Sequence, residues 1–200
     1  MRTVTVEHKA YTFDELEEEV KDTLITQTQE ALENTYCEFW LANDIKDEAG
    51  FLLHEITEDH RIHDISYNLG YGQSDGVCVD FDVWGYDFLL HVTKAHPQLG
   101  ITEEYIDNNL SSFNLTVKQR GWSYSYALDM EIEYQDGGMP LDEDKLEDVI
   151  DNWVWRFNKK LERWGKDSIE YYWKVENVME EILSDLRDNE YTEDGEIFQH

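Results

Sequence analysis

The amino-acid sequence predicts an α+β fold, with an antiparallel β-sheet and long helices packed on one of its faces. Residues 122–134 alternate between apolar and polar side chains, which is typical of a strand with one buried and one wet face. Residues 142–164 repeat apolar side chains at helical spacing. Elements of each kind are grouped along the chain, as in α+β proteins. Together these three observations predict the fold class.

The first elements are a strand and a long helix. Residues 3–7 alternate β-branched side chains, which predicts a short strand. Thr12 and Glu15 have the spacing of a capping box, so we expect a helix from there to about Asn34. Its apolar positions follow helical spacing at Leu16, Val20, Leu24 and Leu32.

A second helix is expected over residues 36–49, ended by Gly50, with Phe39, Trp40 and Ile45 on its inner side. The middle of the chain then favours β-structure. Alternating or β-branched runs predict strands at 51–58, 62–69, 77–84 and 113–118. The glycine-rich residues 70–76 lead from one strand to the next, which predicts a hairpin turn and not a phosphate-binding loop.

The last elements are helical, apart from one edge strand. Short helices are expected at 86–94 and 102–110, and the long helix at 142–164 is expected to end at Gly165. A further helix over 167–189 and an edge strand at 196–198 complete the prediction. No Gly/Ser/Pro-rich linker interrupts the sequence and the acidic charge is spread evenly, so we expect a single acidic domain over residues 1–200.

The charge excludes several classes of function. The chain carries 46 Asp and Glu against 16 Lys and Arg, a net charge of −30 at pH 7. Such a chain repels nucleic-acid backbones and anionic membranes, so neither is expected as a direct partner. The sequence contains no apolar run long enough to span a membrane and no signal-peptide pattern. Cys37 and Cys78 do not make a disulfide framework, so we expect a cytoplasmic protein without a cofactor.

Histidines and strand carboxylates could form a metal site, or they could simply be polar residues of the surface. His54, His60 and His63 lie near acidic residues, but their spacing lacks the pattern of a metal site, so no metal is expected. The strand carboxylates could hold Mg²⁺ for a metal-dependent hydrolase, although few cations lie nearby to stabilise a transition state. Neither cysteine has a catalytic sequence context, and we expect no catalytic residue.

The negative charge itself is the stronger candidate for a functional feature, as a surface that binds a partner protein. A globule of this length is roughly 40 Å wide, and that length of duplex DNA carries roughly 24 charges, close to the charge of this chain. Carboxylates at alternate strand positions and on helix faces would stand at fixed spacing. The predicted partner-binding carboxylates are Asp80, Asp82, Asp129, Glu131, Glu133, Asp142, Glu143, Asp144 and Asp148.

Four short segments carry a resemblance that spans most of the chain: residues 12–16 (TFDEL), 71–77 (YGQSDGV), 169–172 (IEYY) and 189–195 (NEYTEDG). In this order they resemble a group of small acidic proteins of tailed phages and prophages, to which no catalytic residues are assigned. The resemblance implies expression in the cytoplasm of a host bacterium.

Together with the charge, the resemblance favours an anti-CRISPR or antirestriction protein. Such an inhibitor would imitate DNA in the basic groove of a host nuclease or defence complex. A metal-dependent hydrolase and a phage structural or assembly protein are the alternatives.

Overall fold

The computed structural model describes residues 9–70, 76–109, 113–119, 128–134 and 143–198. Its helices and antiparallel sheets confirm the α+β class. The chain forms two compact units, residues 1–40 with 167–200 and residues 41–166. The strand expected at 3–7 lies outside the described residues, and the single domain over residues 1–200 stays a prediction.

The first unit is built from the two ends of the chain. In chain order it contains β1 (Tyr11–Thr12), the 3₁₀ turn η1 (Phe13–Glu15), α1 (Glu18–Thr35), the π turn η2 (Tyr36–Trp40), the last residues of α5 (Glu143–Trp173), α6 (Val175–Arg187) and β6 (Glu190–Tyr191). Strands β1 and β6 pair in antiparallel register, with Tyr11 opposite Tyr191. An isolated bridge joins Tyr191 to Ile197, inside the segment expected to form an edge strand.

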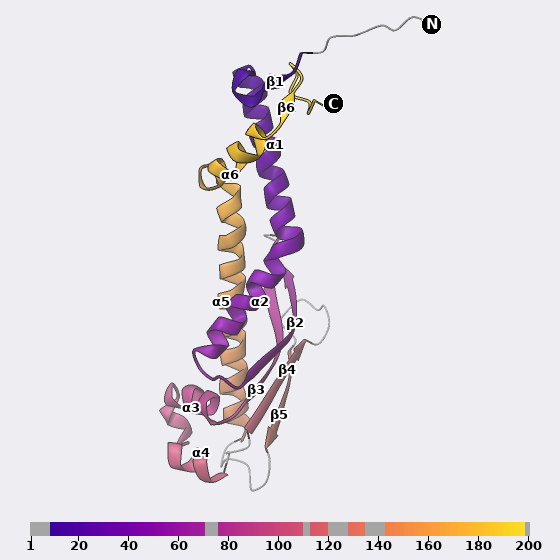
Figure 1. Ribbon diagram of the computed structural model, residues 1–200. Helices are drawn as coiled ribbons and strands as arrows, with labels where there is room; N and C mark the ends of the chain where they lie inside the picture. Colours follow the sequence, from indigo (N-terminus) through magenta and orange to yellow (C-terminus); the bar gives the residue numbers. More distant parts are fainter. Residues whose placement is uncertain (1–8, 71–75, 110–112, 120–127, 135–142, 199–200) are drawn as a thin grey trace, which may run out of the picture. The chain divides into compact units, whose positions relative to one another are not determined.

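Apolar stripes of α1 and α6 form the core of this unit, and the two helices lie side by side (Figure 1). The buried side chains are Phe13, Leu16, Val178, Ile182, Leu186 and Tyr191. Val20, Leu24 and Leu32 of α1 pack against them, which confirms the helical spacing seen in the sequence.

The capping residues lie where the sequence placed them, but they cap a shorter element. The Glu15 carboxylate accepts hydrogen bonds from the Thr12 backbone N–H and hydroxyl group, both at 2.9 Å. The backbone bond to Thr12, followed by the hydroxyl bond, lowers the pKa of Glu15. The element that follows Thr12 is the single turn η1, which ends at Glu15. The long helix α1 begins only at Glu18.

Gly195 provides a first test of the packing in this unit. Its φ is +85°, and an added Cβ would lie 2.7 Å from Val20 Cγ1. Gly195→Ala is therefore expected to lower the free energy of unfolding by about 2 kcal/mol, from backbone strain plus the forced contact. Urea denaturation measures the change.

Gly100 is the matched control for that substitution, because its φ is also positive, at +68°, but nothing lies within 4 Å of an added Cβ. Gly100→Ala should cost only the backbone strain, about 1 kcal/mol. Equal losses in the two variants would contradict the packing of Gly195 against α1.

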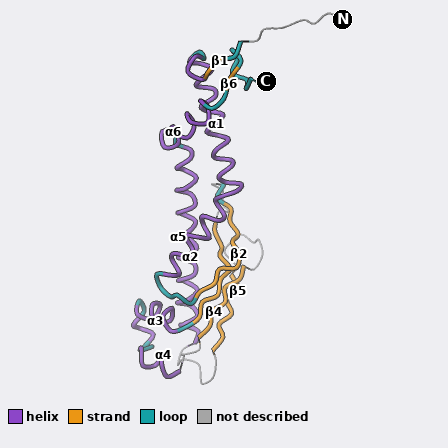
Figure 2. The backbone as a smooth tube through the Cα atoms, viewed as in Figure 1, coloured by secondary structure: helices purple, strands orange, loops and turns teal. Residues whose placement is uncertain are grey.

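The second unit contains, in chain order, α2 (Leu41–His54), β2 (His60–Asn68), β3 (Gly76–Trp84), α3 (Tyr86–Lys94), the 3₁₀ turn η3 (Pro97–Leu99), α4 (Glu103–Asn109), β4 (Phe113–Gln119), β5 (Leu128–Tyr134) and α5 up to Lys166. The four strands, drawn in orange in Figure 2, form one antiparallel sheet. Their order in the sheet is β2-β3-β4-β5. Asn68 pairs with Gly76, which confirms the hairpin expected between β2 and β3.

One face of this sheet is buried against α5. The fully buried positions of β3 alternate, at Val77, Val79, Phe81 and Val83, and Cys78 on the opposite face is also buried, at 8 % exposure. The ring of Phe81 lies edge-on to Trp153 and Phe157 of α5, with ring centres 6.5 and 5.5 Å apart. Residues 128–134 form β5, so part of the expected strand is confirmed, and residues 122–127 lie outside the described residues.

Two glycines that were expected to end helices lie inside them. Gly50 lies inside α2, which continues to His54, so the strand expected at 51–58 is wrong. Gly165 lies inside α5, which continues to Trp173. An added Cβ on Gly165 would lie 2.7 Å from Leu69 Cδ1, so this glycine lets the helix approach its neighbours closely.

The inner face expected for the second helix is also partly wrong. Ile45 is buried, but Phe39 and Trp40 are exposed. They belong to the π turn η2, which contains an extra residue relative to an α-helical turn. Buried positions on either side are therefore five residues apart, at Tyr36 and Leu41, and the two aromatic side chains between them face solvent.

Candidate interaction surfaces

Asp82 lies at the centre of a polar contact on the sheet face opposite α5. Its carboxylate lies 2.7 Å from His63 Nε2 and accepts a hydrogen bond from the Thr116 hydroxyl at 2.8 Å. The pairing of β2 with β3 shifts by one residue between Ile62 and Asp64, and the residue at this bulge is His63. Bulges redirect side chains in this way, so the bulge explains how His63 reaches Asp82.

These contacts keep Asp82 ionised. Partial burial raises its pKa, but the hydrogen bonds from His63 and Thr116, with the charges of His63 and Lys118, outweigh burial and lower it overall. The Asp82 side chain is only 17 % exposed. Its oxygens are thus already used within the sheet, which makes Asp82 a weaker candidate for partner binding than the sequence suggested. Its neighbour Asp80 is half-buried.

The acidic residues of β5 are placed by strand register. Asp129, Glu131 and Glu133 pair with Lys118, Thr116 and Asn114 of β4. Thr116 pairs in turn with Asp82 of β3, so β4 separates the two groups of carboxylates expected on this face. The side chains of the β5 residues lie outside the described part of the chain.

The start of α5 carries the clearest acidic surface. Asp142 and the side chain of Glu143 lie outside the described residues, but Asp144 and Asp148 are exposed. Glu147 and Asp151, which the predicted set left out, are exposed on the same helix, and their spacing of three and four residues was the signal that could have found them. We call these four exposed residues (Asp144, Glu147, Asp148 and Asp151) the acidic stripe.

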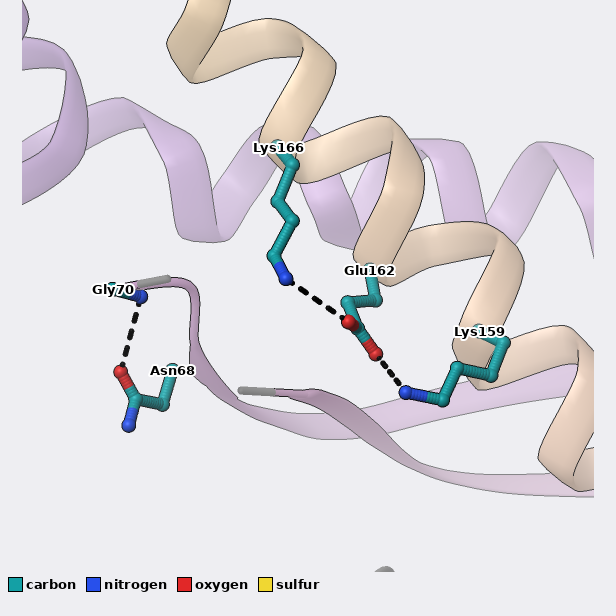
Figure 3. A network of polar contacts seen from close by, with 5 residues as sticks. All are labelled: Asn68, Gly70, Lys159, Glu162 and Lys166. Atoms are coloured by element: carbon teal, nitrogen blue, oxygen red, sulfur yellow. Dashed lines mark hydrogen bonds and ion pairs between the residues drawn. The ribbon is translucent and has the colours of Figure 1, made fainter. Parts of the chain in front are cut away.

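Beyond the acidic stripe, the charge of the side chains along α5 changes from negative to positive. The exposed Trp155 is followed by cationic residues at Arg156, Lys159, Lys160, Arg163 and Lys166. Glu162 lies between two of them, with its carboxylate 2.5 Å from Lys159 Nζ and 3.2 Å from Lys166 Nζ (Figure 3). The outward charge of α5 between Arg156 and Lys166 is therefore mainly cationic, and exposed carboxylates return at Asp167 and Glu170.

The geometry of the described residues does not support metal binding or catalysis by a cysteine nucleophile. Within the described residues, no group of three or more His, Cys, Asp or Glu side chains is placed to hold a metal ion. His54 and His60 instead lie edge to face, with ring centres 6.1 Å apart. Burial, together with nearby acidic charge, raises the pKa of the Cys37 and Cys78 thiols, which disfavours the nucleophilic thiolate.

Comparisons with protein-family models, curated proteins and solved structures found no match for this chain. In the described residues, no helix has the length and apolar content needed to cross a membrane. The resemblance to small acidic phage proteins therefore stays a prediction from the sequence.

Proposed function

We propose that this protein is a non-enzymatic inhibitor that occupies the basic nucleic-acid groove of a host defence protein, a CRISPR effector or restriction enzyme. Its carboxylates take the place of phosphates. The observation that carries the proposal is the acidic stripe at the start of α5. The buried Leu146 and Ile150 hold this part of the helix against the core, so its carboxylates stand on a fixed support.

The spacing of the acidic stripe supports this mimicry. Its four carboxylates lie within eight residues of α-helix, and the seven steps from Asp144 to Asp151 give a rise of about 10.5 Å at 1.5 Å per residue. That gives one carboxylate per ~3.5 Å along the axis, close to the ~3.4 Å between phosphates on one strand of duplex DNA, with Lys145 as an exposed cation in the same turns. A basic groove shaped for a nucleic-acid strand meets a similar linear charge density.

A second acidic surface lies on α6 in the other unit. Val178, Ile182 and Leu186 form the buried side of this helix. Its outer side carries exposed carboxylates at Glu176, Glu180, Glu181 and Asp185, and the exposed Asp188 follows its last residue. Each unit therefore displays an anionic helix of its own, which supports binding by charge.

The cellular setting is part of the same proposal. The resemblance to phage and prophage proteins supports a place in the cytoplasm of an infected bacterium, where nucleic-acid-binding defence proteins act. A metal-dependent hydrolase and a phage structural protein are the alternatives, and no contact in the described residues favours either one.

The test is capture from bacterial lysate followed by competition. The wild-type protein should retain nucleic-acid-binding proteins and release them when DNA oligonucleotides or salt are added in excess. A variant that neutralises the acidic stripe, with Asp144→Asn, Glu147→Gln, Asp148→Asn and Asp151→Asn, should lose this retention.

A matched variant controls for net charge. Glu55→Gln, Glu58→Gln, Asp87→Asn and Glu104→Gln remove the same number of exposed charges from scattered positions of the same unit, and should keep retention. Retained proteins that oligonucleotides do not displace, or full retention by the variant of the acidic stripe, would overturn the proposal.

A further inference from the structure

Large aromatic side chains are exposed in the first unit. Phe39 and Trp40, adjacent in the π turn η2, are 60 % and 58 % exposed, and Tyr171 and Trp173 near the end of α5 are 51 % and 43 % exposed. Neighbouring aromatic pairs of this size are seldom left in solvent unless they serve an interaction.

The two helices that carry these side chains are held together locally. Tyr36 stacks on Tyr172 with ring centres 4.4 Å apart, and the indole N–H of Trp173 donates to Glu33. The Gln29 side chain also donates to the backbone carbonyl groups of Tyr172 and Trp173, at 3.1 and 2.6 Å. These contacts therefore fix the backbone next to the exposed aromatic rings.

The charge around Phe39 and Trp40 points to a cationic partner. Residues 30–40 contain no Lys or Arg, and they carry exposed carboxylates at Glu30 and Glu38, whereas Glu33 already accepts the Trp173 hydrogen bond. An arginine side chain can satisfy both features at once, because its guanidinium group pairs with carboxylates and stacks on aromatic faces.

We propose that Phe39 and Trp40 act as surrogate bases, and that the groove they enter is one that binds unpaired nucleic acid. Grooves for single strands combine basic side chains with planar groups, arginine among them, that stack on successive bases. This inference rests on the proposed function and specifies its partner. The carboxylates of the unit replace phosphates, and the adjacent rings replace two bases between them.

Two exposed aromatic residues of the other unit, Trp155 and Phe51, lack this combination. Trp155 of α5 is followed directly by Arg156, and Phe51 of α2 stands without an exposed aromatic neighbour in the sequence. They serve as a matched control, since one Phe and one Trp of similar exposure, 60 % and 46 %, can be removed from the other unit.

The first test uses nona-arginine and nona-lysine peptides as probes, with binding followed by fluorescence anisotropy of labelled peptide. The wild-type protein should bind nona-arginine about fivefold more tightly than nona-lysine, because only guanidinium groups add stacking to charge. Phe39→Ala/Trp40→Ala should reduce this preference by about threefold while nona-lysine binding stays the same. Phe51→Ala/Trp155→Ala should keep it.

A conservative variant separates stacking from apolar contact and from loss of folding. Phe39→Leu/Trp40→Leu keeps apolar side chains at the π turn but removes both aromatic faces, and it should lose the preference for arginine as fully as the alanine variant. An unchanged preference in either variant overturns the inference. If neither peptide binds, both the inference and the proposed function fail.

The second test uses the proteins captured from lysate. Single-stranded oligonucleotides should displace them at a lower phosphate concentration than duplex oligonucleotides do. Better displacement by duplex DNA would overturn the assignment to a single-strand groove while leaving the charge-based function standing.

Discussion

Replacing Gly165 with leucine is expected to lower the free energy of unfolding by about 3 kcal/mol, the largest single-residue effect that the fold suggests. Gly165 is buried in the middle of α5. A Cβ at this position would lie 2.7 Å from Leu69 Cδ1 and 3.4 Å from Ile45 Cδ1. A leucine side chain extends further into the same space, so α5 has to move away from its neighbours in the second unit.

Urea denaturation followed by circular dichroism measures this loss. Gly50→Ala in α2 is the control, because an added Cβ there would meet only Ile62 Cδ1, at an ordinary contact distance of 3.7 Å. It should raise stability by up to about 1 kcal/mol through helix propensity. A Gly165→Leu variant as stable as the wild type would show that α5 does not pack closely at this point.

Neutralising Glu162 is expected to cost about 2 kcal/mol. The Glu162 side chain is only 12 % exposed and contacts both Lys159 and Lys166, which are 36 % and 26 % exposed. Glu162→Gln would remove one counter-charge that two partly covered ammonium groups share. Because both lysines keep some contact with water, the loss should be smaller than for a fully buried pair.

Glu170→Gln is the matched control for Glu162→Gln. Glu170 also pairs with a lysine of the following turn, Lys174, at 2.8 Å, but both side chains are about half exposed. The control should change the free energy of unfolding by no more than about 0.5 kcal/mol. Similar losses in the two variants would show that the burial of Glu162 has no energetic consequence.

Burial on one face is the part of the fold that the sequence predicts well. The alternation at Val77, Val79, Phe81 and Val83 identified β3, and the helical spacing of Leu146 and Ile150 identified the start of α5. These patterns are local and follow directly from which side of an element meets the core.

Glycine was the main source of error. In a sequence, the same residue that ends a helix can also permit close packing inside one, and only the three-dimensional neighbours distinguish the two roles. At Gly165 those neighbours, Leu69 and Ile45, lie far away along the chain. The π turn has no signal in the apolar pattern, because a spacing of five residues between buried positions, as at Tyr36 and Leu41, does not follow the α-helical period.

The candidate surfaces show the same difference: exposure on one helix follows from the local sequence, whereas contacts between strands do not. Exposure of Asp144 and Asp148 follows from the period of one helix, so the sequence was sufficient to predict it. The contact of Asp82 with His63 and Thr116 requires the register of three strands and a bulge. No local pattern carries that information, which explains why Asp82 was expected to be available to a partner.

The discontinuous first unit also has a consequence for folding during synthesis. Residues 41–166 are contiguous, so the second unit can form as soon as they leave the ribosome. Helix α1 ends at Thr35, and its partner α6 begins at Val175, 140 residues later. At about 5 to 20 residues per second, α1 waits roughly 7 to 28 s for that partner with its apolar stripe uncovered. The first unit is thus completed last, and α1 is the element most exposed to chaperones and proteases on the nascent chain.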